Sequence, residues 1–415
     1  MLRFALFLAV GAFAQDALLL RNATIHPVAG PEVSASVLIK DGIIAEIGAK
    51  ITAPKTTRTL DLKGLHVYPG MIDSATTLGL AEIGSVRETQ DTTELGDYNP
   101  QLRAIIAVNP SSEHIPVARA NGITSAVVLP DGAVIGGQAG LMHLDGWTWE
   151  EMAIQRAAAL HLKFPVLRTT VPGEFFERPR TIPYKEAKTA HEQTLRKLSA
   201  LFEDARRYAK AKGGAGFQID RKLEALQPVL EGKLPLLVSA VREREIREAL
   251  DFAEKEKVRV ILAGPRRFGA QLERVKARKI PVILGETMSL PLEEDDAYDA
   301  QYSLPGELHR AGVPFAFATF GSSDVRNLPY QAAASVPFGL PAEQALKAVT
   351  IEPAKIWGVD DKLGSIEQGK WADLIVTDGD PLEIRTQVKR MFIRGREVSL
   401  ESRHTKLYEK FAGRP

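Results

Sequence analysis

The sequence predicts an α/β protein, a TIM-type (β/α)8 barrel with a small β-sandwich formed by the N- and C-terminal segments. Through the middle of the chain, short apolar runs alternate with helical patterns, which is typical of βαβ units and a parallel sheet. Strand-like segments with turn residues lie at both chain ends, and neither end has enough strands for a stable sheet of its own. A chain of 415 residues is long enough for a barrel and an accessory domain.

The barrel strands are predicted from apolar runs that turn residues bound on both sides. A helix over residues 192–212 places Leu and Phe side chains on one stripe and ends at Gly213. A second helix over 243–257 has apolar residues at helical spacing with charges between them. Seven strand candidates are found and the eighth is not identified: 67–73, 124–130, 140–144, 234–240, 258–263, 280–285 and 313–320.

The accessory domain is predicted from both ends of the chain. Residues 37–47 contain Asp41-Gly42 between two β-branched runs, which is the strongest short signal of a hairpin. Short strands with flanking turn residues recur near the C-terminus, over 372–376 and 391–396. The stretch over 163–188 has no clean period, and we expect a long loop across the barrel mouth.

The first 14 residues resemble a secretory signal. One positive charge, a short apolar run and a small-x-small site are its three parts, and the apolar run is too short to span a bilayer. We therefore expect an exported protein, periplasmic or extracellular, with no membrane span. The predicted organisation is a signal peptide over 1–14, a composite β-sandwich domain over 15–69 and 358–415, and a barrel domain over 70–357.

The charge balance and the cysteine content exclude several classes of function. With 53 Lys and Arg against 52 Asp and Glu, no global field attracts a polyanion, so nucleic acid is not expected as a partner. Cysteine is absent, so neither disulfides nor thiolate ligands or nucleophiles are available. We expect the partner to be a small-molecule ligand.

Separated motifs carry a resemblance to a known family. Residues 64–73 read GLHVYPGMID, and the later motifs are ALKAVTIEPAK over 345–355, GSIEQGKWADL over 364–374 and Gly379-Asp380-Pro381. In this order they resemble the imidazolonepropionase-like members of the amidohydrolase superfamily. The resemblance implies hydrolysis of carbon–nitrogen, non-peptide bonds in a cyclic amide or similar small substrate. It also implies Zn or another divalent metal as the cofactor.

The same resemblance shows where metal ligands are expected. In the family, a His-x-His pair ends the first barrel strand, and residues two apart on a strand point to one face and grip one ion. The corresponding residues here are Ala75 and Thr77, and further family histidines correspond to Ser239 and Ala263. Alanine cannot coordinate a metal, and a neutral hydroxyl is a poor substitute for an imidazole. Asp324 matches the family's carboxylate, a metal ligand and proton shuttle.

From this ligand set we expect no bound metal and a hydrolytic activity that is weak or lost, because a catalytic zinc needs about three protein ligands. We also expect that the double change Ala75→His and Thr77→His disturbs folding little, since both positions lie at a mouth. Asp324 has an alternative role as an ion-pair partner of Arg326 that holds the last loop.

Other polar residues are candidates for binding a substrate. His143 follows the glycine-rich turn that contains Gln138 and lies on a predicted strand, where it either binds a ligand beside Asp324 or is a structural core residue. Glu286 follows a predicted strand, and the carboxyl ends of barrel strands face the site. The predicted substrate-binding residues are thus His143, Gln138, Ser239 and Glu286.

Two classes of function remain open. In the first, Asp324 acts as the acid or base of a hydrolase and any metal is held by unusual ligands such as His143 and Glu286. In the second, the barrel is non-catalytic and binds a small molecule, or it pairs with an active relative as a homo- or hetero-oligomer.

Overall fold

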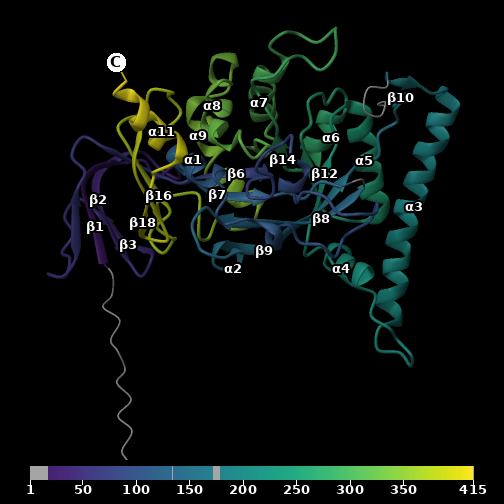
Figure 1. The fold of residues 1–415 in the computed structure, drawn as a ribbon, viewed down its shortest axis with the longest axis horizontal. Helices are drawn as coiled ribbons and strands as arrows, with labels where there is room; N and C mark the ends of the chain where they lie inside the picture. The colour runs from purple at the N-terminus through teal and green to yellow at the C-terminus, as the bar shows by residue number, and fades with distance from the viewer. Residues whose placement is uncertain (1–16, 133, 172–177, 415) are drawn as a thin grey trace, which may run out of the picture.

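The structure is a computed structural model that describes residues 17–132, 134–171 and 178–414. The predicted signal peptide over 1–14 lies outside the described residues. Figure 1 shows an eight-stranded barrel between two flanking parts: a sheet made from both ends of the chain on one side, and the long helix α3 (Tyr184–Ala211) on the other. No helix within the described ranges combines the length and the apolar character that crossing a bilayer requires.

The barrel sheet contains eight strands in the order β15-β14-β13-β12-β9-β8-β7-β6. Each of the seven predicted strands overlaps one of them, and the eighth is the 11-residue strand β9. The strands are β6 (Met71–Thr76), β7 (Ile123–Val128), β8 (Ile135–His143), β9 (Ala153–Lys163), β12 (Leu236–Ser239), β13 (Val260–Ala263), β14 (Val282–Leu284) and β15 (Phe315–Phe317).

Strand β8 runs antiparallel to both of its neighbours, β7 and β9. The other neighbouring pairs in this sheet are parallel, so the barrel departs from an all-parallel (β/α)8 arrangement at this one strand. As a result, the end of β8 lies at the amino ends of the parallel strands: His143 is paired with Ser125 near the start of β7.

Helices follow or separate the barrel strands. Helix α3 begins eight residues before the predicted start, and its buried side chains include Leu198 and Phe202 of the predicted stripe. The predicted mouth loop contains the short pair β10 (Thr170–Val171) and β11 (Arg180–Thr181). The remaining helices are α1 (His114–Ala120), α2 (Trp149–Met152), α4 (Arg221–Leu230), α5 (Glu243–Glu256), α6 (Gln271–Ala277), α7 (Ala300–Ala311), α8 (Leu328–Ala333), α9 (Ala342–Lys347), α10 (Ile351–Ile356) and α11 (Arg403–Ala412).

Both chain ends build one sheet, in the order β18-β17-β16-β5-β1-β2-β3 with β4 paired to β1. The predicted hairpin is confirmed: Asp41 and Gly42, with φ of 52° and 78°, form the two-residue turn between β2 and β3. These strands are β1 (Ala17–Ile25), β2 (Val33–Lys40), β3 (Ile43–Gly48), β4 (Arg58–Asp61), β5 (His66–Pro69), β16 (Leu374–Thr377), β17 (Val388–Ile393) and β18 (Arg396–Val398).

The predicted β-sandwich is not confirmed, because the eight strands are hydrogen-bonded as one continuous sheet. The sheet curls, since Ile43 of β3 forms an isolated bridge with Trp371 just before β16. Inside it packs a cluster of buried apolar side chains from both chain ends, among them Leu20, Ile25 and Phe392. The residue boundaries between the two predicted domains stay a prediction.

Asp73 joins the first and last strands of the barrel. Its Oδ1 accepts hydrogen bonds from the amides of Ala75 (3.2 Å) and Thr319 (3.1 Å), and its Oδ2 accepts one from Thr319 Oγ1 (2.5 Å). The amide of Phe320 also donates to the carbonyl of Ala75 at 2.8 Å. Together these contacts close the seam between β6 and the end of β15, which no regular strand pairing spans.

We predict that Asp73→Ala lowers the free energy of unfolding by about 3 kcal/mol, because three buried donors lose their acceptor. Asp73→Asn keeps an acceptor for both amides and an amide group for the threonine hydroxyl, so it should change stability by less than about 1 kcal/mol. Urea unfolding of the three proteins measures the difference. Equal losses for Ala and Asn would contradict the hydrogen-bonding role.

Wild type and Asp73→Asn also test the protonation of Asp73. Burial raises the pKa of the Asp73 carboxyl from 3.8 to about 7. Between these pH values the folded state binds a proton that the unfolded state has released, so wild type should lose stability relative to Asp73→Asn as the pH rises from about 4 to 7.

Candidate functional site

The barrel mouth is formed by residues at the carboxyl ends of the parallel strands. Ala75 at the end of β6 and Ala263 at the end of β13 both belong to the apolar cluster that fills the barrel interior. Ser239 ends β12, where it is paired with Ala263 and lies two residues after the inward-facing Leu237. Thr77 follows β6 and is half-buried. At these positions, histidines in the family would point toward one ion, and here no imidazole or carboxylate is present.

A histidine that is not among the predicted site residues lies beside Ser239. His161 on β9 is 4% exposed, and its Nε2 lies 2.9 Å from Ser239 Oγ and its Nδ1 lies 2.7 Å from the carbonyl oxygen of Pro130. Because a carbonyl can only accept, Nδ1 carries the proton and Nε2 accepts from the serine hydroxyl. Burial lowers the pKa of His161 to about 4, so the imidazole is neutral at physiological pH.

The ring of Phe320 lies across the mouth. Phe320 has a left-handed backbone conformation with φ of 54°, and its side chain packs against the apolar cluster of the barrel interior. The Phe320 ring also packs against the ends of β13 and β14. Cβ atoms placed on Gly264 and Gly285, which follow these strands, would lie 4.0 and 3.7 Å from the ring. A positive φ is unusual for a bulky residue, and it turns this ring toward β13 and β14.

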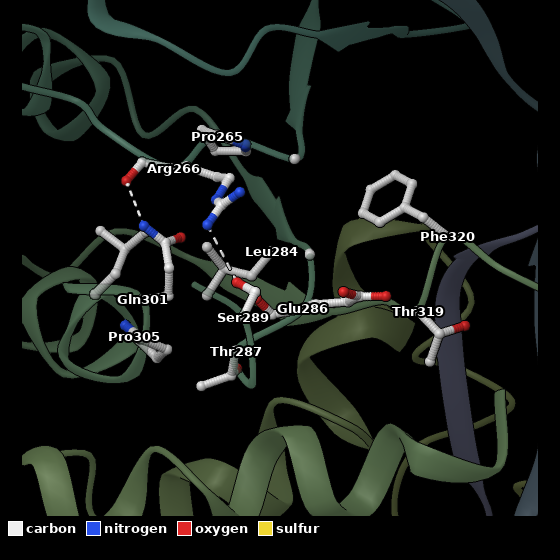
Figure 2. A pocket seen from close by; sticks show the side chains of 13 residues that line it. Pro265, Arg266, Leu284, Glu286, Thr287, Ser289, Gln301, Pro305, Thr319 and Phe320 are labelled. Atoms are coloured by element: carbon white, nitrogen blue, oxygen red, sulfur yellow. Dashed lines mark hydrogen bonds between the residues drawn. The ribbon is translucent and has the colours of Figure 1, made fainter. Parts of the chain in front are cut away.

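A pocket of about 240 Å³ opens beside this ring, between the ends of β13, β14 and β15 and the helix α7. Figure 2 shows Arg266 and Glu286 reaching into it from two neighbouring strand ends, with Phe320 and Thr319 at its side. The pocket therefore combines a guanidinium, a carboxylate and an aromatic wall. Pockets that bind drug-sized molecules are usually larger, so this one fits a ligand of about amino-acid size.

Neighbouring elements hold the two charged residues in place. The amide of Arg266 donates to the carbonyl of Val241, and its Nη2 donates to Ser289 Oγ at 3.2 Å and to the carbonyl of Leu290. Glu286 precedes Thr287, whose amide is held by Gln331 Oε1 on α8 at 2.7 Å. The loop after β14 is thus fixed on both sides of the pocket.

The predicted site residues do not come together. His143 lies at the opposite end of the barrel, where its Nε2 is 2.8 Å from Oδ2 of the buried Asp373, so the expectation that it lies beside Asp324 is not met. Because β8 is antiparallel, its end faces the terminal sheet. Gln138 donates to the carbonyl of Pro100 at 2.9 Å and lines a different cavity, beside α4. Of the four predicted substrate-binding residues, Glu286 alone lines the mouth pocket.

Asp324 lies in the loop after β15 and precedes a 3-10 turn over Val325–Asn327. Its carbonyl accepts from the amide of Asn327 at 2.8 Å, and Ser323 Oγ is 3.4 Å from its Oδ2. In the part of the chain that the structure describes, no ion pair joins Asp324 to Arg326, and no three His, Asp or Glu side chains form a group that could hold a metal ion.

Comparisons with known proteins agree with this architecture. Residues 241–398 match the model of the Amidohydrolase family. The imidazolonepropionase of Porphyromonas gingivalis is 26% identical over 393 residues, which cover 85% of this chain and 84% of that protein. The crystal structure of an amidohydrolase from Thermotoga maritima superposes with a TM-score of 0.78 and 26% identity, over 92% of this chain and 99% of that one. The chain belongs to the amidohydrolase superfamily.

Another similar protein is much longer than this chain. The amidohydrolase tasK of Hapsidospora irregularis is 24% identical over 398 residues, which are 86% of this chain and 39% of that protein. The chain thus spans well under half the length of that relative. Family membership accounts for the barrel, and the strand ends of this chain hold Ala75, Thr77, Ser239 and Ala263.

We predict that the imidazole of His161 stays neutral until the pH falls to about 4. Its folded pKa lies below the 6.5 of an unfolded histidine, so its contribution to stability is present at neutral pH and is lost as the pH falls from about 6.5 through 4. NMR titration of protein labelled at histidine measures this value, and His161→Gln assigns the signal. A His161 signal that titrates near 6.5 would contradict the buried, hydrogen-bonded state.

We predict that histidines introduced at the two family positions differ in their effect. Ala75 is fully buried in the filled interior, so Ala75→His should lower the free energy of unfolding by about 1–3 kcal/mol, the usual cost of overpacking. This corrects the expectation of little disturbance at that position. Thr77→His, at a half-buried position, should cost less than about 1 kcal/mol. Thermal unfolding compares them, and an unchanged melting temperature for Ala75→His would show room at the mouth.

Proposed function

We propose that this amidohydrolase superfamily member does not carry out the metal-dependent hydrolysis of carbon–nitrogen bonds, and that its barrel mouth binds a small molecule. One observation carries the proposal: the four strand-end positions that correspond to family histidines hold Ala75, Thr77, Ser239 and Ala263. We also propose, from the sequence of the first 14 residues, that the protein is exported to the periplasm or beyond the cell.

The residues at the mouth do not fit a catalytic metal. Alanine has no donor atom, and the Ser239 hydroxyl is hydrogen-bonded to His161. Both ring nitrogens of His161 are also engaged, one by Ser239 and one by the Pro130 carbonyl. A catalytic zinc takes about three protein ligands and an open position for water. Without such a set, the pKa of a water molecule is not lowered to about 7, and hydroxide is not generated at neutral pH.

The alternative of a hydrolase with replacement ligands has less support. It needs His143, Glu286 and Asp324 around one point, and within the described ranges these residues form no such group. His143 is instead buried against Asp373 at the far end of the barrel. Binding of a small molecule needs only the pocket and its polar side chains, which are present beside Phe320.

Elemental analysis of the purified protein tests the proposal. We expect Zn, Mn and Fe far below one ion per chain, both directly after purification and after incubation with excess zinc followed by gel filtration. The second measurement controls for metal lost during preparation. One tightly held equivalent of metal would overturn the proposal, and the variants Asp324→Asn and Glu286→Gln would then show whether replacement ligands hold it.

A further inference from the structure

Two opposite charges in the mouth pocket have no ionic partner. In the part of the chain that the structure describes, no carboxylate lies within 4.0 Å of the Arg266 guanidinium, and no cationic group lies that close to the carboxylate of Glu286. The neighbouring Arg267 is different, because it pairs with Asp295 and Asp296 at 3.3 and 3.1 Å. The two pocket charges also do not pair with each other.

The guanidinium of Arg266 is only partly satisfied by its surroundings. Its Nη2 donates to neutral oxygens of Ser289 and Leu290. Among the described residues, its Nε is buried with no hydrogen-bond partner, and its Nη1 has no hydrogen-bond partner either. A buried donor without a partner costs about 1–3 kcal/mol, and more when it is charged. Because a guanidinium offers several donors in one plane, a carboxylate is the group that matches this unfilled capacity.

Glu286 gives the second half of the site. Glu286 is exposed and lines the same pocket, and the backbone that follows it is fixed because Gln331 Oε1 accepts from the amides of both Thr287 and Met288. A carboxylate is an acceptor only, so its complement is a group with several donors and a positive charge, such as an ammonium. The apolar part of the pocket lining comes from Phe320 together with Leu304 and Pro305 of α7.

From this arrangement we propose that the mouth pocket binds a small zwitterion of amino-acid size, with its carboxylate on Arg266, its ammonium on Glu286 and its apolar side chain against Phe320. This ligand class rests on the proposed function of small-molecule binding at the mouth. The volume of about 240 Å³ favours a free amino acid over a larger peptide. A monovalent anion or amine would leave one of the two pocket charges without its partner.

Three probes of nearly equal shape test the charge pattern. L-leucine carries both charges, 4-methylpentanoate lacks the ammonium, and isopentylamine lacks the carboxylate. Isothermal titration with wild-type protein should give the tightest binding for L-leucine, with about 10- to 100-fold weaker binding for each singly charged probe, as expected for the loss of one charged hydrogen-bonded contact. Equal binding of all three probes, or no binding of L-leucine, would overturn the assignment.

Two variants then assign each charge to its residue. Arg266→Gln should weaken L-leucine and 4-methylpentanoate about 10-fold or more and leave isopentylamine unchanged, and Glu286→Gln should weaken L-leucine and isopentylamine and leave 4-methylpentanoate unchanged. The matched controls are Arg267→Gln and Glu294→Gln, on the same loops, which should bind all probes as wild type does. A uniform loss for every probe, or the same loss in a control, would refute the assignment.

The probe-binding test of the zwitterion site and the elemental analysis that tests the proposed function can fail independently of each other. Tight metal binding in the elemental analysis with the probe pattern intact would overturn the proposal of a metal-free mouth and keep the zwitterion site. No metal together with no binding of L-leucine would overturn the zwitterion site and keep the metal-free mouth.

Discussion

The shape of the barrel mouth depends on the seam that Asp73 makes. Its carboxyl group takes three donors from two strand ends that do not pair as strands, so one buried side chain holds β6 against the end of β15. This contact fixes the backbone at Thr319, just before Phe320, and the amide of Phe320 itself donates to the carbonyl of Ala75. The left-handed conformation of Phe320, which costs about 1–3 kcal/mol, persists because its surroundings determine it.

In the interior of the barrel mouth, the positions of the family histidines hold no imidazole or carboxylate. The charged side chains of the mouth pocket lie to one side of these positions. Where the family places imidazoles around an ion, this chain has two alanines, a threonine and a serine, and the aromatic ring of Phe320 packs over two glycines. The histidine that does point inward is neutral and has both nitrogens engaged. The charged side chains that line the mouth pocket are Arg266 and Glu286, in the loops after β13 and β14. The pocket that we propose as the ligand site therefore lies beside the position where a metal would act, not at it.

The sequence was sufficient for much of the fold, because local patterns determine it. The Asp41-Gly42 turn requires positive φ at both residues, and both have it. Strand β9 was missed because its AIQRAAALHLK sequence is rich in alanine, which favours helix and gives no alternation. The direction of β8 could not be predicted, because the sequence of one strand does not indicate whether its neighbours run parallel or antiparallel to it. That single fact moves His143 from the mouth to the opposite end.

For the site, the positions of Ala75, Ser239 and Ala263 followed from the family motif, and the structure places them at strand ends in the barrel interior. Residues whose role depends on the fold were not found from the sequence. His161 lies on the strand that was missed. Arg266 follows a predicted strand just as Glu286 does, and the rule that selected Glu286 would have selected it too. The position of the Phe320 ring depends on an unusual backbone conformation, which no local sequence motif indicates.

The sheet of both chain ends has a consequence for the order of assembly. Strand β16 lies between β5 and β17, and Arg58 near the N-terminus bonds to Glu397, 339 residues later. During synthesis the first five strands therefore emerge long before the partners that complete their sheet. Contacts of such large sequence separation form slowly, so the nascent N-terminal segment has to remain unaggregated until the last part of the chain arrives.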